Sequence, residues 1–201
     1  MNRLSRLCLL VLLWSCAAFA TSIGVTDSTT ASGTIGSISF SDAAITIRGF
    51  GNDARVVDVG EGYYFLDLSY VTITIQGLGT FKITTPTRFF SNKPLVGFSR
   101  AGVDGNDLID GPTISQVWNM KTSLGPITGD GFIFQWSLFP VETDAGVIVL
   151  NDSDSVPVTF GATVGAPAPE PSTISLLVVG LGSMAGRAGL RRRKQSAGCP
   201  S

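Results

Sequence analysis

The side chains that could do chemistry in this chain are almost all carboxylates. The sequence contains no histidine, and its three cysteines, Cys8, Cys16 and Cys199, lie near the two ends. Nucleophilic systems that pair serine or cysteine with histidine are therefore excluded, as are most zinc sites. A carboxylate pair for glycoside hydrolysis needs only Asp and Glu at the right separation. No spacing singles out such a pair around Glu61 or Glu142, so we expect a protein that is not an enzyme.

Two acidic loops carry oxygen ligands of the kind that calcium prefers. Their members are Asp104, Asn106, Asp107 and Asp110 in the first loop, and Asn151, Asp152 and Asp154 in the second. The spacing does not follow the EF-hand loop, and Asp and Asn commonly close turns through their own backbone. We therefore expect turn-forming roles, no resident metal and no cofactor, with calcium binding as the alternative.

Charge is distributed unevenly along the chain. Residues 21–168 hold seven basic and fourteen acidic side chains, a net charge near −7, and the other seven basic residues lie in the two ends. An acidic central region without a basic patch argues against nucleic acid as a partner. That region also lacks cysteine, so it must rely on its apolar core rather than on disulfides.

The N-terminus has the features of a secretory signal peptide. Arg3 and Arg6 precede an apolar run over residues 7–14, and Ala18 and Ala20 form the small-x-small site that signal peptidase accepts. We predict a signal peptide over residues 1–20, read by the secretion machinery. An uncleaved anchor helix and a lipoprotein signal ending at Cys16 are the alternatives.

The C-terminus combines a proline-spaced acid, an apolar run and a basic cluster. Residues 165–172 form a predicted extended spacer that contains Pro169, Glu170 and Pro171. Residues 173–190 include one charge, and as a helix they would extend about 27 Å, close to the thickness of a bilayer core. Residues 191–201 form a basic cytoplasmic tail in which four residues stop transfer across the inner membrane, namely Arg191, Arg192, Arg193 and Lys194.

The order of these C-terminal features resembles the PEP-CTERM sorting signal of Gram-negative bacteria. The resemblance covers about the last thirty residues. It implies that a membrane-embedded exosortase recognises the chain, cuts near Pro169-Glu170-Pro171 and passes the protein to the cell surface or the medium. It also implies an association with exopolysaccharide, so the sequence predicts an exported envelope or matrix protein with a structural or binding role.

The central region has the pattern of an all-β fold. Apolar and polar residues alternate over residues 43–50, 70–77, 79–85 and 131–138, and further strands are expected at 146–151 and 156–163. No segment sustains a helical apolar period. We predict a flexible lead over residues 21–32 within one exported domain, 21–164, folded as an antiparallel β-sandwich or jelly roll.

Five aromatic side chains are candidates for stacking on sugar rings: Trp118, Trp136, Tyr63, Tyr64 and Tyr70. Trp136 falls on an apolar row with Phe132, Phe134 and Leu138, which predicts a core position. Tyr70 falls on the polar face of its strand, and one of the adjacent pair Tyr63 and Tyr64 should face outward. Cross-strand packing is the expected role, and a calcium- or glycan-binding module is the alternative.

Overall fold

The computed structural model describes residues 21–102 and 106–166, and antiparallel strands dominate this part of the chain. The predicted all-β, antiparallel class is confirmed. Within the described residues the only helical element is the short 3-10 helix η1 (Asp53–Arg55). The strands in chain order are β1 (Ser22–Ile35), β2 (Ile38–Asn52), β3 (Val57–Gly60), β4 (Tyr63–Asp67), β5 (Tyr70–Ile75), β6 (Gly79–Ile83), β7 (Thr87–Asn92), β8 (Leu95–Arg100), β9 (Asp107–Asp110), β10 (Leu124–Ile133), β11 (Val141–Thr143), β12 (Gly146–Leu150) and β13 (Ser153–Ala166).

All thirteen strands belong to one sheet, in the order β12-β11-β6-β5-β2-β1-β13-β10-β9-β8-β7-β4-β3. The sheet closes on itself because β12 pairs with β11 on one side and with residues 33–35 of β1 on the other. Strands β1, β2, β5, β6, β11 and β12 thus form a closed six-stranded barrel, which we call the ring. The other seven strands form the lobe together with the first half of β1, Ser22 to Ser28, which pairs with β13. The predicted sandwich or jelly roll of separate sheets is not confirmed.

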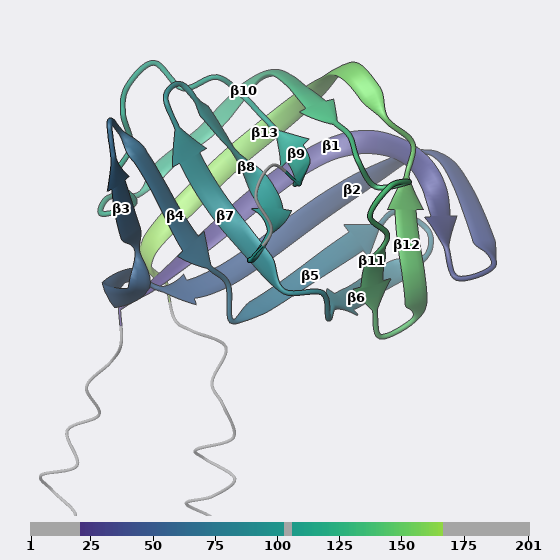
Figure 1. Cartoon of the computed structure of the whole chain (residues 1–201). Coiled ribbons are helices and arrows are strands. Elements are labelled where there is room, and N and C mark those ends of the chain that lie inside the picture. Colours follow the sequence, from purple (N-terminus) through teal and green to yellow (C-terminus); the bar gives the residue numbers. More distant parts are fainter. Residues whose placement is uncertain (1–20, 103–105, 167–201) are drawn as a thin grey trace, which may run out of the picture. The chain divides into compact units, whose positions relative to one another are not determined.

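The long strand β1 joins the ring to the lobe. Its first half, Ser22 to Ser28, pairs with β13 of the lobe, and its last residues, Gly33 to Ile35, pair with β12 of the ring. Its other edge pairs with β2 along nearly its full length. Figure 1 shows β1, β2, β13 and β10 running side by side, with β4, β7 and β8 in front of them.

The two parts have different cores. The ring is filled by small and branched aliphatic side chains, namely Ala31, Ile35, Ala43, Ile45, Ile73, Ile75, Ile83, Val141, Ile148 and Leu150. A closed barrel of so few strands is narrow, and the two phenylalanines on its inward face, Phe40 and Phe81, are only partly buried against this core. The lobe encloses aromatic side chains. The rings of Phe89 and Phe160 stack with centroids 5.5 Å apart, and Phe98 and Trp118 meet Phe89 edge-on.

Inward-facing glycines allow both parts to close. A Cβ on Gly33 would overlap the carbonyl oxygen of Val149, so only glycine permits β12 to approach β1 and complete the ring. On β2, Cβ atoms at Gly49 and Gly51 would meet the side chains of Leu68 and Leu66 at 2.6 Å and 2.7 Å. These two glycines provide the space in which β4 packs against the long strands.

Three predictions about the central region are wrong. Residues 22–32, predicted as a flexible lead, belong to the central strand β1, because both neighbouring strands pair with its backbone. The predicted strand over residues 131–138 ends at Ile133, which is buried while Phe132 is 40% exposed, and the chain then turns. Strand β13 continues to Ala166, so it includes the first two residues of the predicted spacer.

The predictions for the two ends lie outside the described residues. They concern the signal peptide with Ala18 and Ala20, most of the spacer with its Pro-Glu-Pro motif, the membrane helix over residues 173–190 and the basic tail. Across residues 21–102 and 106–166, no helix is long and apolar enough to cross a membrane.

Candidate binding surface

Six hydroxyl side chains form a row across the outer face of the long strands. We call this the hydroxyl row. It crosses β10, β13, β1, β2, β5 and β6, and its members in spatial order are Thr128, Thr159, Ser28, Thr46, Thr74 and Thr80. Each is the direct register partner of the next. Since neighbouring strands lie about 4.8 Å apart, the row extends about 24 Å along the sheet.

The hydroxyls of the row are bonded to one another in pairs. Thr128 bonds Thr159 at 2.8 Å, Ser28 bonds Thr46 at 3.0 Å, and Thr74 bonds Thr80 at 2.8 Å. This alternation follows from antiparallel geometry, in which a residue is in a close pair with one neighbouring strand and in a wide pair with the other. One O–H in each bonded pair remains available as a donor, and each oxygen keeps acceptor capacity. The row therefore presents a repeating set of donors and acceptors.

A second row lies two residues further along the strands. Its register partners in spatial order are Gly161, Thr26, Arg48, Thr72 and Lys82, on β13, β1, β2, β5 and β6. Gly161 has open space where a side chain would be. By strand geometry the two rows are about 7 Å apart, so one extended ligand could contact both.

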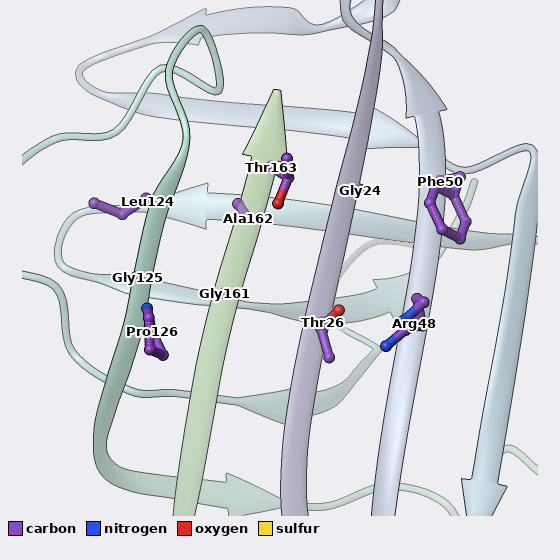
Figure 2. Close-up of a pocket in the computed structure, with 10 residues that line it drawn as sticks. All are labelled: Gly24, Thr26, Arg48, Phe50, Leu124, Gly125, Pro126, Gly161, Ala162 and Thr163. Atoms are coloured by element: carbon purple, nitrogen blue, oxygen red, sulfur yellow. The ribbon is translucent and has the colours of Figure 1, made fainter. Parts of the chain in front are cut away.

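A trough of about 390 Å³ adjoins the lobe end of these rows. It is floored by bare backbone at Gly24, Gly125 and Gly161 (Figure 2). Thr26 on β1 lies between Gly161 on β13 and Arg48 on β2, and the Arg48 side chain extends from β2 toward β1 (Figure 2). Other lining residues are Phe50, Leu124, Pro126, Ala162 and Thr163. The trough can therefore accept a group that hydrogen-bonds to a hydroxyl and a guanidinium.

Two aromatic side chains continue this surface over the strands of the six-stranded barrel. Phe50 and Tyr70 are register partners on β2 and β5, with ring centroids 6.5 Å apart. The Lys82 ammonium lies 5.9 Å from the centroid of the Tyr70 ring. Tyr70 and Lys82 also line a second hollow of about 250 Å³. The trough, the aromatic pair and the second hollow thus follow one another across the same strands.

Both cations on this surface lack an ionic partner. Arg48 and Lys82 are exposed, and the one ion pair found in the described residues joins Arg88 to Asp67 elsewhere. The carboxylate of Asp144 accepts from the Lys82 backbone N–H at 2.9 Å rather than from its ammonium. The two cations are therefore available to a ligand.

The lobe also buries a set of polar groups without hydrogen-bond partners. Both carboxyl oxygens of Asp27 are of this kind, as is Oδ1 of Asp110. Burial raises the pKa of Asp27 well above its ordinary value, and the nearby Asp110 raises it further. Burial, followed by the charge of Asp107, raises the pKa of Asp110 to about 7. Since these groups face the interior, we assign them to the energetics of the fold rather than to the surface site.

The structure divides the predicted aromatic candidates. Trp118 and Trp136 are buried in the lobe, where Trp118 donates to the Thr122 carbonyl and Trp136 to the Leu108 carbonyl. The predicted core position of Trp136 is confirmed, although Phe132 and Leu138 from its predicted row are exposed. Tyr70 is 39% exposed, as its place on the polar face predicts. Tyr63 and Tyr64 are both half-buried on β4, away from the two rows.

The acidic loops are not drawn together into a cluster. Asn106 and Asp110 are buried, Asp107 is half-buried, and Asp104 lies outside the described residues. Asn151 and Asp152 are exposed at the turn between β12 and β13, and Asp154 is exposed near the start of β13. Among residues 21–102 and 106–166, no three His, Cys, Asp or Glu side chains are grouped as metal ligands would be.

Comparison with known proteins identifies the C-terminus. Residues 167–194 match the PEP-CTERM protein-sorting motif, which confirms the predicted resemblance and with it an exported chain recognised by an exosortase. No curated protein and no solved structure matches the chain.

Proposed function

We propose that this protein is sorted to the cell surface and there binds an extended polysaccharide through the outer face of its long strands, without catalysing a reaction. The hydroxyl row is the observation that carries the proposal. Six hydroxyls from six strands stand in register, and they form three hydrogen bonds in which both partners are hydroxyls of the row. A polymer that itself presents hydroxyls at a regular spacing can exchange hydrogen bonds with such a row along its length.

The chemistry of the face favours a sugar polymer over a protein partner. Protein interfaces are built around a buried apolar core, whereas this face is dominated by threonine and serine with two aromatic rings at one side. Phe50 and Tyr70 offer flat surfaces on which the apolar side of a sugar ring can lie. The trough then receives a substituent of the polymer beside Thr26 and Arg48.

The ends of the folded body suit display from a membrane. Ser22 at the start of β1 is the register partner of Ala166 at the end of β13, so the chain enters and leaves the body at one end. We propose that a cleaved signal peptide exports the body and that the predicted helix over residues 173–190 holds it at the inner membrane until exosortase acts. The β1–β2 hairpin at residues 36–37 is at the opposite end of β1.

The binding proposal is tested by affinity electrophoresis of the full chain, solubilised in mild detergent, through gels that contain single polysaccharides. The row variant carries Ser28→Ala, Thr46→Val and Thr74→Val, which remove hydroxyls at nearly constant side-chain volume. We expect the parent to be retarded by at least one polymer and the row variant to migrate freely. A control variant, Ser37→Ala with Thr113→Val, removes exposed hydroxyls outside the row and should behave like the parent.

The sorting step is tested separately in a host that carries the cognate exosortase. Changing Pro169, Glu170 and Pro171 to alanine should leave membrane insertion intact, because the predicted span and basic cluster are unchanged, and should block processing. Fractionation with mass spectrometry of the mature C-terminus measures this. Release and trimming of the alanine variant at the parent's rate would show that the tail acts only as an anchor.

A further inference from the structure

We infer that the polysaccharide bound by this face is anionic, with acidic groups that contact Arg48 and Lys82. This inference rests on the proposed function and adds the chemical class of the ligand. It follows from the position and the unpaired state of the two cations, together with the polar groups that surround them.

The two cations are placed as a pair along the direction of the hydroxyl row. Arg48 on β2 and Lys82 on β6 flank Thr72 on β5 in the second row, so they are separated by two strand spacings, or about 10 Å. When one acidic group of an extended polysaccharide contacts Arg48, the next sugar units can follow the row toward Lys82. A single cation among neutral groups defines no spacing along a polymer. Two cations aligned with the hydroxyl row do define one.

The charge balance of the body makes this placement informative. Residues 21–168 carry a net charge near −7, yet the middle of the second row presents two cations, and the carboxylate bonded beside it, that of Asp144, accepts from the Lys82 backbone N–H rather than from the ammonium. Salt screens the repulsion from the distant acids within about 8 Å at physiological ionic strength. The local cations therefore determine which ligand this face accepts.

The neighbouring groups supply what an acidic sugar needs besides charge. The planar guanidinium of Arg48 can donate two parallel hydrogen bonds to a carboxylate or a sulfate. Thr26 and Thr163 line the same trough and can bond to adjacent sugar hydroxyls. At the other side, Lys82 already lies over the Tyr70 ring, which holds the ammonium beside an aromatic surface.

The test uses the full chain in detergent with four polymers: polygalacturonate, its methyl ester, dextran sulfate and dextran. The site variant is Arg48→Gln with Lys82→Gln. The matched control is Arg55→Gln with Lys93→Gln, which makes the same change in net charge at two exposed cations outside both rows. Melting temperatures of both variants are measured beside the binding, so that loss of fold is recognised.

We expect the parent to bind polygalacturonate more tightly than its methyl ester or dextran, and the site variant to lose about tenfold or more in affinity, as removal of charged hydrogen bonds does. The control should keep the parent's affinity. Dextran sulfate distinguishes the acidic group: equal binding means that charge alone is read, and weaker binding means that the carboxylate shape is read. Either result supports an anionic ligand.

The inference is overturned if the folded site variant binds polygalacturonate like the parent, or if the control loses as much affinity as the site variant. Tighter binding of dextran or of the methyl ester would also overturn it while leaving the proposed function in place. Failure of the proposed function looks different, because the parent and the row variant would then be indistinguishable on all four polymers.

Discussion

The ring and the lobe share β1 as a boundary strand but reach stability by different means. In the ring, β-branched and small aliphatic residues fill the buried part of a narrow closed barrel, so these side chains bring no polar atoms into it. In the lobe, stacked and edge-on aromatic rings fill a wider space that also encloses the carboxyl of Asp110 and the guanidinium of Arg100. Closure of the backbone limits the size of the side chains, whereas curling without closure leaves room for rings and polar groups.

The outer face does not follow this division. The hydroxyl row begins on β10 and β13 of the lobe and continues over β1, β2, β5 and β6 of the ring. The two parts differ in the size of their inward side chains, because the width of the interior limits those side chains and places no limit on the outward ones. A binding face that crosses both parts therefore needs the ring closed and the lobe packed.

The largest effect is expected from opening the ring. Gly33→Val would place side-chain atoms against the Val149 carbonyl and close to the Leu150 Cα, and backbone cannot yield as a side chain can. Overpacking typically costs about 1–3 kcal/mol, and we expect this substitution to exceed that range or to prevent folding. Urea unfolding monitored by circular dichroism measures the loss.

A glycine on the outer face provides the matched control for Gly33. Gly161→Ala adds a methyl group where no atom lies within 4 Å. We expect its free energy of unfolding to stay within about 0.5 kcal/mol of the parent. Equal losses at Gly33 and Gly161 would mean that closure of β12 onto β1 is not what requires a glycine.

The next effect separates the two cores. Trp136 is fully buried in the lobe and its Nε1 donates to the Leu108 carbonyl at 2.7 Å. Trp136→Ala should cost about 3–5 kcal/mol, whereas Ile73→Val in the ring should cost about 0.5–1.5 kcal/mol. Thermal and urea unfolding of both variants check the order, and an unchanged melting temperature for Trp136→Ala would contradict the assignment of this residue to the core.

A pH dependence should come from the lobe. The pKa values of Asp27 and Asp110 are raised in the folded state, that of Asp110 to about 7, so the folded body binds more protons than the unfolded chain above about pH 4. The free energy of unfolding should therefore fall as pH rises from 4 to 7, and Asp27 should extend the fall to higher pH. Unfolding measured at pH 4, 6 and 8 checks the slope.

The variant Asp27→Asn sharpens that measurement. Because asparagine carries no charge at any of these pH values, the variant should be more stable than the parent at pH 8 and closer to it at pH 4. A parent whose stability rises steadily from pH 4 to 8 would contradict the assignment of protonated carboxyls to the lobe.

The smallest effect on stability is expected on the outer face. Thr74→Val removes one member of an exposed hydroxyl pair with Thr80, and we expect a change within about 0.5 kcal/mol. Unfolding in urea measures it. A loss above 2 kcal/mol would show that the hydroxyl row is retained for folding, and this would remove the main argument for a ligand.

Local alternation in the sequence predicts much of the fold. Val71, Ile73 and Ile75 are buried and Thr72 and Thr74 face outward, as the period of two requires. Local alternation does not predict strand β1, because "SIGVTDSTTASGTI" carries few large apolar residues and its strand structure depends on pairing with β2 and β13.

The hydroxyl row could not be predicted from the sequence. The alternation identifies Thr46 and Thr74 as outward residues, but their alignment with Thr128, 82 residues from Thr46, depends on the register of strands that are distant in the chain. Turns fix register only between neighbours in a hairpin. By contrast, the sorting signal is contiguous, so the order of its features shows the resemblance over about the last thirty residues, and the family match at residues 167–194 confirms it.

The most direct test of the binding face is a nuclear magnetic resonance titration of the body, residues 21–168, with short polygalacturonate chains. The proposal predicts that amide shifts change on outward residues of β13, β1, β2 and β5, centred on Thr26, Arg48 and Thr72, and that the interior of the lobe around Trp136 is unaffected. Shifts centred on Tyr63 and Tyr64 of β4, or no shifts with any polysaccharide tested, would contradict it.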